Sequence, residues 1–314
     1  MSESRHNPDQ LLKEIQADEE NRNKGHLKIF FGYAAGVGKT YAMLEAAHME
    51  KQQGIDVVAG YVETHARPKT AALLNGLEVL PTRKVFYNGM ILDEFDIGMA
   101  LKRKPQLILV DELAHTNAEG CRHAKRYQDI KELLNAGIDV YTTVNVQHIE
   151  SLCDTVASIT EIVVRERIPD SIFDNADQVE LIDIEPQDLI NRLNTGNVYR
   201  QTQAKQAVEN FFTIENLTAL REISLRRCAD RVNILTENTR IKNHGDYHTG
   251  EHILVCLSSS PSNAKIIRTA AKMASAFKGE FTALFVETPD FSVMSEENVK
   301  RLRSNCLLYT SPSP

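Results

Sequence analysis

The 314-residue sequence lacks any run of about 18 or more apolar residues, so no membrane-spanning helix is expected within it. It also lacks a CxxC pair, because its five cysteines are scattered along the chain. Neither a disulfide framework nor a zinc site is therefore expected, and a reducing cytosol is the predicted compartment. The formal net charge of −7 argues against a dedicated nucleic-acid binder, whose surface would be basic.

Short apolar runs alternate with amphipathic segments through most of the chain. The runs lie at 27–31, 55–62, 84–87, 106–111, 138–144, 161–165 and 179–184, and the amphipathic segments at 38–53, 67–77, 92–102, 124–136 and 147–157. This alternation predicts an α/β fold in which helices flank a parallel sheet. The run from Gln106 to Val110 is apolar almost throughout, as expected for a strand buried on both faces.

A glycine-rich stretch, GYAAGVGKT, lies between the first expected strand and the first expected helix. This context is the one that a phosphate-binding P-loop requires. Gly36 and Gly38 let the backbone curl so that successive N–H groups face a phosphate. Lys39 would neutralise phosphate charge, and the Thr40 hydroxyl would hold Mg²⁺. The helix N-terminus that follows adds a partial positive charge, which also favours a phosphate.

The spacing of this stretch departs from the strict P-loop pattern. The first glycine of the pattern belongs where Tyr33 stands, and Gly32 comes one residue too early. The small side chains of Ala34 and Ala35 are expected to compensate. An ordinary glycine-rich turn with an incidental lysine is the alternative. The predicted nucleotide-binding residues are Gly32, Ala35, Gly36, Val37, Gly38, Lys39 and Thr40.

A second motif favours the nucleotide site over that alternative. The segment QLILVDE, Gln106 to Glu112, is an apolar strand that ends in an acidic pair. Asp111 would hold Mg²⁺ through water, together with Thr40, and Glu112 would polarise an attacking water. A strand that ends in two solvated acids is the alternative. The two motifs together predict ATP and Mg²⁺ as ligands, whereas hydrolysis depends on a geometry of Glu112 that a sequence does not give.

Several long strings in the chain resemble the N-terminal cytoplasmic region of KdpD-type sensor histidine kinases, which respond to potassium. They are GYAAGVGKTYAML, GYVETHARPKT, LVDELAHTN and RHAKRYQDIKELLNAGIDVYTTVNVQHIESL, and the resemblance runs from about 25 to 300. It implies a regulatory role in potassium uptake and tolerance of the offset glycine. It further implies transmembrane and kinase domains downstream in the full-length polypeptide, a response regulator as partner, and a place at the cytoplasmic face of the plasma membrane.

The kinase activity of that family depends on parts that these 314 residues do not encode. They are the transmembrane helices, a phospho-accepting histidine in a helical hairpin and an ATP-grasping kinase domain. The histidines of the first domain, His65, His115, His123 and His148, are expected to be loop or core residues. The alternative for His115, which comes just after the acidic pair, is that it faces the nucleotide.

The C-terminal part resembles the universal-stress-protein module that follows in this family. Ser258-Ser259-Ser260, twenty further residues and then FTALF resemble the signature SxS-x20-FTAxY, by which some members bind cyclic di-AMP. Phe285 replaces the tyrosine, so a hydroxyl contact is lost while ring stacking remains. A capped helix and a core strand form the alternative. The predicted second-ligand residues are Ser258, Ser260, Phe281, Thr282, Ala283 and Phe285.

The sequence therefore predicts the sensory region of a two-component sensor kinase, with a P-loop α/β domain followed by a truncated universal-stress-type α/β domain. A stand-alone P-loop ATPase or small-molecule kinase is one alternative, and a cytoplasmic regulator without a kinase partner is another. The expected regions are an arm at 1–25, a nucleotide-binding domain at 26–229, a linker at 230–250, a partial universal-stress domain at 251–304 and a foreign or disordered tail at 305–314.

Overall fold

In this computed structural model the described residues are 24–64, 67–87, 89–194, 211–243, 252–258, 260, 262–277 and 280–286. The chain divides into two compact units, Met1–Ala229 and Asp230–Pro314. Most of the expected N-terminal arm and the whole of the expected tail lie outside the described residues.

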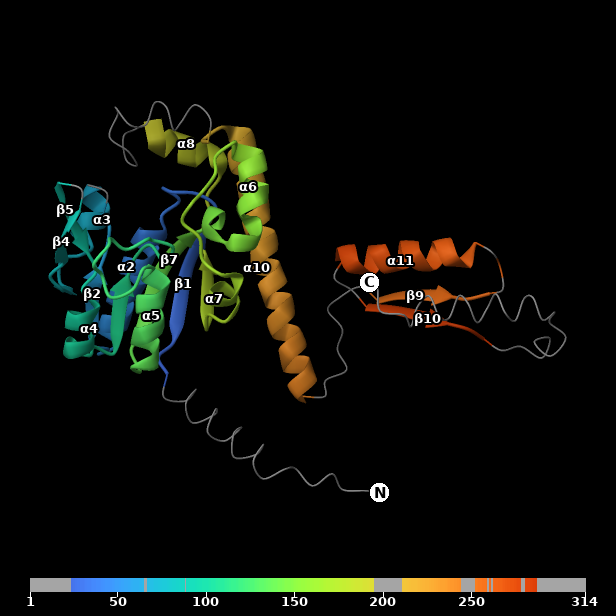
Figure 1. Ribbon diagram of the computed structural model, residues 1–314, viewed down its shortest axis with the longest axis horizontal. Helices are drawn as coiled ribbons and strands as arrows, with labels where there is room; N and C mark the ends of the chain where they lie inside the picture. The colour runs from blue at the N-terminus through green and yellow to red at the C-terminus, as the bar shows by residue number, and fades with distance from the viewer. Residues whose placement is uncertain are drawn as a thin grey trace, which may run out of the picture. The chain divides into compact units, whose positions relative to one another are not determined.

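The first unit contains a six-stranded sheet in which every pair of neighbouring strands is parallel (Figure 1). The order of its strands is β3-β2-β6-β7-β1-β8. The strands are β1 (Leu27–Gly32), β2 (Val57–Tyr61), β3 (Glu78–Val79), β6 (Leu107–Val110), β7 (Asp139–Asn145) and β8 (Gln178–Leu181). The glycine-rich stretch follows β1 and the acidic pair follows β6, so β7 separates the two motifs within the sheet.

Helices cover both faces of this sheet, which confirms the predicted α/β fold (Figure 1). They are α2 (Lys39–Gln52), α3 (Pro68–Ala72), α4 (Ile97–Arg103), α5 (Arg126–Asn135), α6 (Cys153–Thr160), α7 (Asp170–Asp174), α8 (Pro186–Asn194) and α10 (Ile214–Asn243), with short 3₁₀ turns η1 (Val146–His148) and η2 (Glu150–Leu152).

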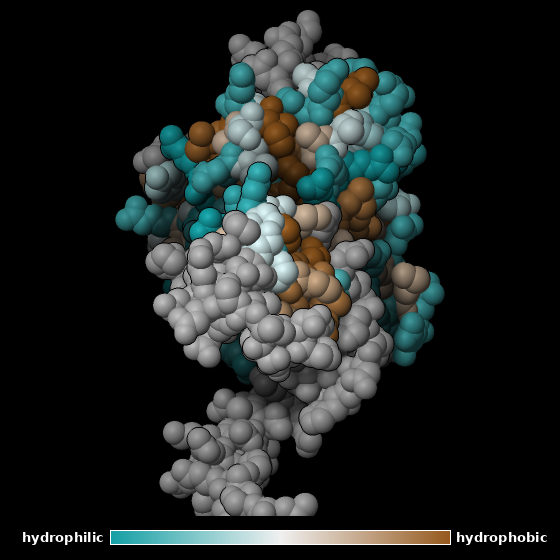
Figure 2. Space-filling model, turned by 90° about the vertical axis from the view of Figure 1, so that its right-hand side faces the viewer, coloured by the Kyte–Doolittle hydropathy of each residue, from teal (hydrophilic) through white to brown (hydrophobic). Residues whose placement is uncertain are grey.

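Strand β1 shows how the two faces are built, because successive side chains of a strand point to opposite sides. Phe30 packs with Met43 and Leu44 of α2 on one face. Ile29 and Phe31 point to the other face, where helices α4 to α8 and α10 contribute the core. The described residues of β6 are fully buried, as the apolar run at 106–110 predicts. On the face drawn in Figure 2, by contrast, apolar residues lie in separate patches among hydrophilic ones.

Two of the predicted apolar runs do not join this sheet, whereas β3 joins it although no strand was predicted there. Instead of joining the sheet, the run at 84–87 forms an antiparallel hairpin of β4 (Arg83–Tyr87) and β5 (Met90–Glu94). Its turn contains Gly89 with φ 80°, in an Asn-Gly sequence typical of tight hairpins. The run at 161–165 forms no strand, because α6 ends at Glu161 in a left-handed conformation and Val163 is left 71% exposed.

The expected linker at 230–250 is also different, because α10 continues through its first part to Asn243. The reason is visible in the sequence: residues 230–243 contain no glycine or proline that would end a helix. The second unit then contains a strand, a helix and a second strand, in keeping with the predicted α/β character of this region. β9 (His252–Cys256) pairs in parallel with β10 (Glu280–Leu284), and α11 (Asn263–Phe277) packs against them through Ile267 and Ala270.

Candidate functional site

The loop between β1 and α2 folds back over the end of its own strand. Gly36 and Gly38 have φ angles of 91° and 114°, in a left-handed region that glycine enters without steric cost. A Cβ added at Gly32 would lie 2.7 Å from Val37 Cγ2 and 3.2 Å from Lys39 Cδ. Gly32 therefore allows a close approach of the loop, although it stands one residue before the place where the strict pattern requires glycine.

Tyr33 occupies the place of the missing glycine and anchors the loop. Its side chain is fully buried, and its hydroxyl donates a hydrogen bond to the Ile184 carbonyl oxygen at 3.1 Å. Burial, with a smaller effect of Asp183, raises the pKa of Tyr33 to about 12. Tyr33 is absent from the non-glycine residues with positive φ in the described part of the chain, so the offset costs no backbone strain.

Lys39, the first residue of α2, reaches back across the loop. Its Nζ donates a hydrogen bond to the Ala34 carbonyl oxygen at 3.0 Å, and only 8% of the residue is exposed. Burial lowers the pKa of Lys39 to about 8; the charge of Asp111 opposes this shift and that of Arg67 adds to it. The ammonium group is thus desolvated without full compensation, and an arriving phosphate would supply the missing negative charge.

Thr40 and Asp111, 71 residues apart in the sequence, meet at this end of the sheet. The Thr40 hydroxyl donates to Asp111 Oδ2 at 3.1 Å, while Asp111 Oδ1 accepts from the Thr143 hydroxyl and, at 3.1 Å, from the Glu112 backbone N–H. Asp111 is only 1% exposed, so these bonds hold its carboxylate in one orientation. Hydroxyl and carboxylate oxygens are the ligands that Mg²⁺ prefers, so the pair fits the predicted metal.

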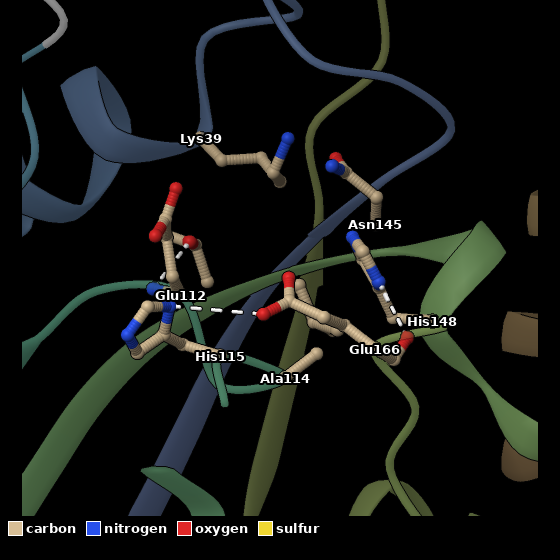
Figure 3. A pocket seen from close by; sticks show the side chains of 9 residues that line it. Lys39, Glu112, Ala114, His115, Asn145, His148 and Glu166 are labelled. Carbon is tan, nitrogen blue, oxygen red and sulfur yellow. Dashed lines mark hydrogen bonds and ion pairs between the residues drawn. The ribbon is translucent and has the colours of Figure 1, made fainter. Parts of the chain in front are cut away.

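Glu112 faces a small pocket beside Lys39 (Figure 3). Its φ of 58° is unusual for a residue other than glycine. Burial and, next, the charge of Asp111 raise the pKa of the Glu112 carboxyl. The pocket volume of about 70 Å³ is too small for a nucleoside but has room for water next to a phosphate held by Lys39.

The pocket is also lined by polar side chains that the motifs did not predict as binding residues. Among them are His115, Asn145, His148 and Glu166, which Figure 3 shows around one hollow. His115 lines a pocket that also contains Lys39, and its alternative of facing a nucleotide stays a prediction. His148 lies in the 3₁₀ turn η1, in keeping with the expectation of a loop or core residue. Burial lowers the pKa of His148, whose Nδ1 lies 2.8 Å from the Glu166 carbonyl oxygen. The signal that could have identified Asn145 and His148 is their place at and just after the carboxyl end of β7, at the edge where strands of a parallel sheet gather ligands.

A buried arginine fixes the end of β6 beneath the pocket. Arg126 is fully buried and donates to the Asp111 carbonyl oxygen at 3.2 Å, to Glu94 Oε2 at 3.1 Å and to Asn117 Oδ1 at 3.2 Å. Its guanidinium also lies 4.3 Å from the centre of the Tyr61 ring. The DELAHTN segment and α5 are thereby tied to the strand that presents the acidic pair.

A larger pocket, of about 520 Å³, lies along the outer side of the glycine-rich loop. It has the size of a site for a nucleoside with its phosphates. Loop residues, the first turn of α2, the start of α3 and α8 all contribute to its wall. The lining residues are Gly36, Val37, Gly38, Tyr41, Ala42, Arg67, Pro68, Lys69, Thr70, Ile182 and Arg192.

The residues of the second predicted site take part in local structure. The Ser258 hydroxyl accepts from the Ser260 N–H at 3.2 Å, and the Asn263 amide donates to the Ser258 carbonyl oxygen at 2.6 Å, at the start of α11. Phe281, Ala283 and Phe285 pack against the small apolar core of this unit. The Thr282 hydroxyl lies 2.8 Å from His252 Nε2. These contacts match the alternative of a capped helix and a core strand, and the ligand itself stays a prediction.

A protein-family comparison identifies what this arrangement belongs to. Residues 23–232 match the family described as "KdpD: Osmosensitive K+ channel His kinase sensor domain". The chain belongs to the KdpD sensor-domain family. This confirms the resemblance of the GKT, DELAHTN and VNVQHIESL strings, which all lie within the matched residues.

Individual KdpD relatives agree with this result. The chain is 58% identical to the sensor protein KdpD of Clostridium acetobutylicum over 287 residues, which are 90% of this chain and 32% of the relative. It is 50% identical to sensor protein KdpD of Escherichia coli, over 96% of this chain and 33% of that protein. The putative sensor protein KdpD of Synechocystis is 48% identical over 84% of this chain and 70% of the relative.

The chain spans about a third of the length of the first two of these relatives. Among its described residues, none of the helices is both long and apolar enough to cross a membrane.

Proposed function

We propose that this chain is the nucleotide-binding sensory region of a potassium-responsive two-component sensor kinase, and that it binds ATP with Mg²⁺. The observation that carries the proposal is the convergence of Lys39, Thr40 and Asp111 beneath a loop whose glycines have the conformation of a phosphate cradle. Family membership supports the regulatory part, and the loop geometry supports the ligand.

The chain's own groups have distinct tasks in this proposal. The backbone N–H groups of the loop would surround a phosphate, and Lys39 would exchange its bond with Ala34 for a phosphate oxygen. Thr40 and Asp111 would hold Mg²⁺, which neutralises phosphate charge when bound. No group of three or more His, Cys, Asp or Glu side chains within the described ranges is placed to hold a metal ion, so nucleotide oxygens and water would complete its ligands.

Calorimetric titration with ATP–Mg²⁺ tests the ligand assignment. Lys39→Ala should abolish saturable binding and leave the thermal unfolding transition of the chain in place. Lys102→Ala is the matched control, because Lys102 is an exposed lysine on α4 away from the loop. Wild-type affinity in the Lys39→Ala variant would refute the site.

Turnover is a separate proposal that rests on Glu112. Its side chain faces the pocket beside Lys39, where an attacking water would stand, so it is the residue proposed to polarise that water. Glu112→Gln should bind ATP like the wild type and lose phosphate release. Steady phosphate release by the wild type would favour the alternative of an ATPase, whereas release that is unchanged in Glu112→Gln would remove Glu112 from the reaction.

The response to nucleotides is proposed to pass to other parts of the full-length protein, at the cytoplasmic face of the membrane, and through them to a response regulator. A ligand that prefers one conformation shifts the equilibrium of everything attached to it. The Synechocystis relative, of which this chain covers 70%, is less than half as long as the other two, so a regulator without its own kinase domain is the second candidate. Complementation of a kdpD deletion by this chain alone would favour that candidate.

Cyclic di-AMP is proposed as the ligand of the second unit, on the strength of the Ser258 and Ser260 hydroxyls between β9 and α11. An anion is favoured at such a strand-to-helix turn. Phe285→Tyr should strengthen binding, since it restores the hydroxyl of the family signature. Titration of both proteins with cyclic di-AMP tests the proposal, which fails if neither shows saturation.

A further inference from the structure

Two arginines that are not among the predicted nucleotide-binding residues share the 520 Å³ pocket with the glycine-rich loop. Arg67 immediately precedes α3, and Arg192 lies in the last turn of α8. Arg192 Nη1 is 3.5 Å from the Val37 carbonyl oxygen and 3.9 Å from the position of a Cβ on Gly38. A guanidinium therefore lies against the part of the loop that would curl around a phosphate.

The two side chains reach the loop from opposite faces of the sheet. The segment that follows α3 packs, through Leu73 and Leu74, with the core formed by α2. Helix α8 packs through Leu189 and Leu193 into the core on the other face. The loop is thus flanked by one arginine from each layer.

The charge distribution around the loop is asymmetric. Arg67, Arg192 and Lys69 line the outer pocket, whose lining contains no carboxylate among the described residues. Carboxylates gather instead in the small pocket on the other side, with Glu112 and Glu166. The charge of Arg67 reaches Lys39 and lowers its pKa, so two cations already repel each other across this space. A cavity with cations on several sides favours a ligand with several negative charges.

We propose that Arg67 and Arg192 form a clamp on the phosphate chain of the bound nucleotide, Arg67 at its terminal phosphates and Arg192 near the nucleoside. The inference rests on the proposed nucleotide site and extends it to the choice among nucleotides. Arg67 is assigned to the terminal end because the segment that leads to it contacts the residue proposed to hold Mg²⁺: the Glu63 backbone N–H donates to Asp111 Oδ2 at 3.4 Å. In P-loops the metal and the lysine lie at the β- and γ-phosphates. Arg192 contacts the loop at the Val37 carbonyl oxygen, ahead of Lys39 and Thr40. Tyr41, Ala42 and Ile182, which line the same pocket, offer apolar surface to a base and ribose.

A consequence is that the site distinguishes nucleotides by phosphate number. Removing Arg67 should lower the affinity for ATP more than that for ADP, and it should hardly change the affinity for AMP. Removing Arg192 should weaken all three nucleotides to a similar extent. In each of the two variants the affinity for ATP should fall about tenfold or more, the usual size for a hydrogen bond between charged groups.

The test is calorimetric titration of the full chain with ATP, ADP and AMP, each with Mg²⁺, in Arg67→Ala and Arg192→Ala. Lys102→Ala is the matched control, because Lys102 is an exposed cation on α4 that does not line this pocket. This control substitution should lower the affinity for ATP by less than about threefold, as expected of a solvated charge. Arg67→Lys and Arg192→Lys should restore only part of the affinity, since lysine lacks the planar fork of arginine.

The outcomes separate this inference from the function on which it rests. If Lys39→Ala abolishes ATP binding while both alanine variants bind ATP like the wild type, the clamp is refuted and the nucleotide site stands. Equal losses in Lys102→Ala and the arginine variants would also refute the clamp, because they would indicate nonspecific attraction. Wild-type protein that binds no nucleotide would refute both. Unfolding temperatures within a few degrees of the wild type in the two Arg→Lys variants would ensure that an affinity change reports on the site.

Discussion

Binding of ATP at Lys39 should take up a proton, because the ammonium group of Lys39 is desolvated in the free protein. Burial is the main cause that lowers its pKa from 10.5 to about 8. At pH 8 about half of the free protein therefore carries a neutral Lys39. A phosphate chain against the amine favours the charged form and returns its pKa toward its ordinary value, so the bound protein is protonated.

The size of the effect follows from the two pKa values. The expected uptake per ATP is about 0.1 proton at pH 7, 0.5 at pH 8 and 0.9 at pH 9. Affinity should fall as the pH rises above 8, by as much as tenfold per pH unit, because binding then requires a proton that the free site lacks.

Titrations at one pH in two buffers with different ionisation enthalpies, such as HEPES and Tris, measure this uptake directly. His148→Gln is the control, since His148 is the buried titratable ring that lines the same small pocket. Its burial keeps it neutral near pH 8, so its removal should leave the half proton unchanged. Uptake below about 0.1 proton at pH 8 in the wild type would refute the assignment of a desolvated lysine at the phosphate site.

Three other substitutions have defined outcomes. Lys39→Met should raise the free energy of unfolding of the free protein at pH 7 by about 1–3 kcal/mol, measured by urea unfolding. The reason is that the pKa of Lys39 is lower in the folded than in the unfolded protein, and unchanged stability would contradict it. Arg126→Met should destabilise it by about 3–5 kcal/mol, since Glu94 would stay buried without its guanidinium, and adding Glu94→Gln should recover part of the loss. A loss below about 1 kcal/mol would count against that ion pair. Gly32→Ala should weaken ATP binding about tenfold, because a Cβ would collide with Val37, and wild-type affinity would argue against the loop packing.

The sheet of the first unit could be predicted because its strands are short apolar runs separated by amphipathic segments. β2 and β6 lie within predicted runs, and β1, β7 and β8 each extend one residue beyond theirs. The prediction failed where an apolar run is not buried in that sheet. Phe86 and Ile91 pair across the β4–β5 hairpin and are 75% and 67% exposed. These apolar residues therefore contact each other within the hairpin and do not belong to the buried core.

The extent of α10 was missed for a different reason. The stretch at 230–243 is polar, which reads as a linker, but it contains good helix formers and no breaker. Polarity describes how much of a segment faces water, whereas helix formation depends on backbone preferences, and the two need not agree.

The candidate site could be predicted as far as it consists of continuous motifs. Lys39, Thr40 and Asp111 were identified from spacing, and the structure brings the three together. His148 and Glu166 were not, because they enter the small pocket from segments that become neighbours only in the folded sheet. The offset of Gly32 could not be judged from sequence either, since it depends on the approach of Val37 and on the buried anchor of Tyr33.

The most direct test of the central claim is a crystal structure of this chain with Mg²⁺ and a non-hydrolysable ATP analogue. We expect phosphate oxygens within hydrogen-bond distance of the backbone N–H groups of 36–40, with Lys39 on the terminal phosphates and the metal at Thr40. A nucleotide bound elsewhere, or a loop that closes on itself through Lys39 and Ala34 with no nucleotide, would contradict it.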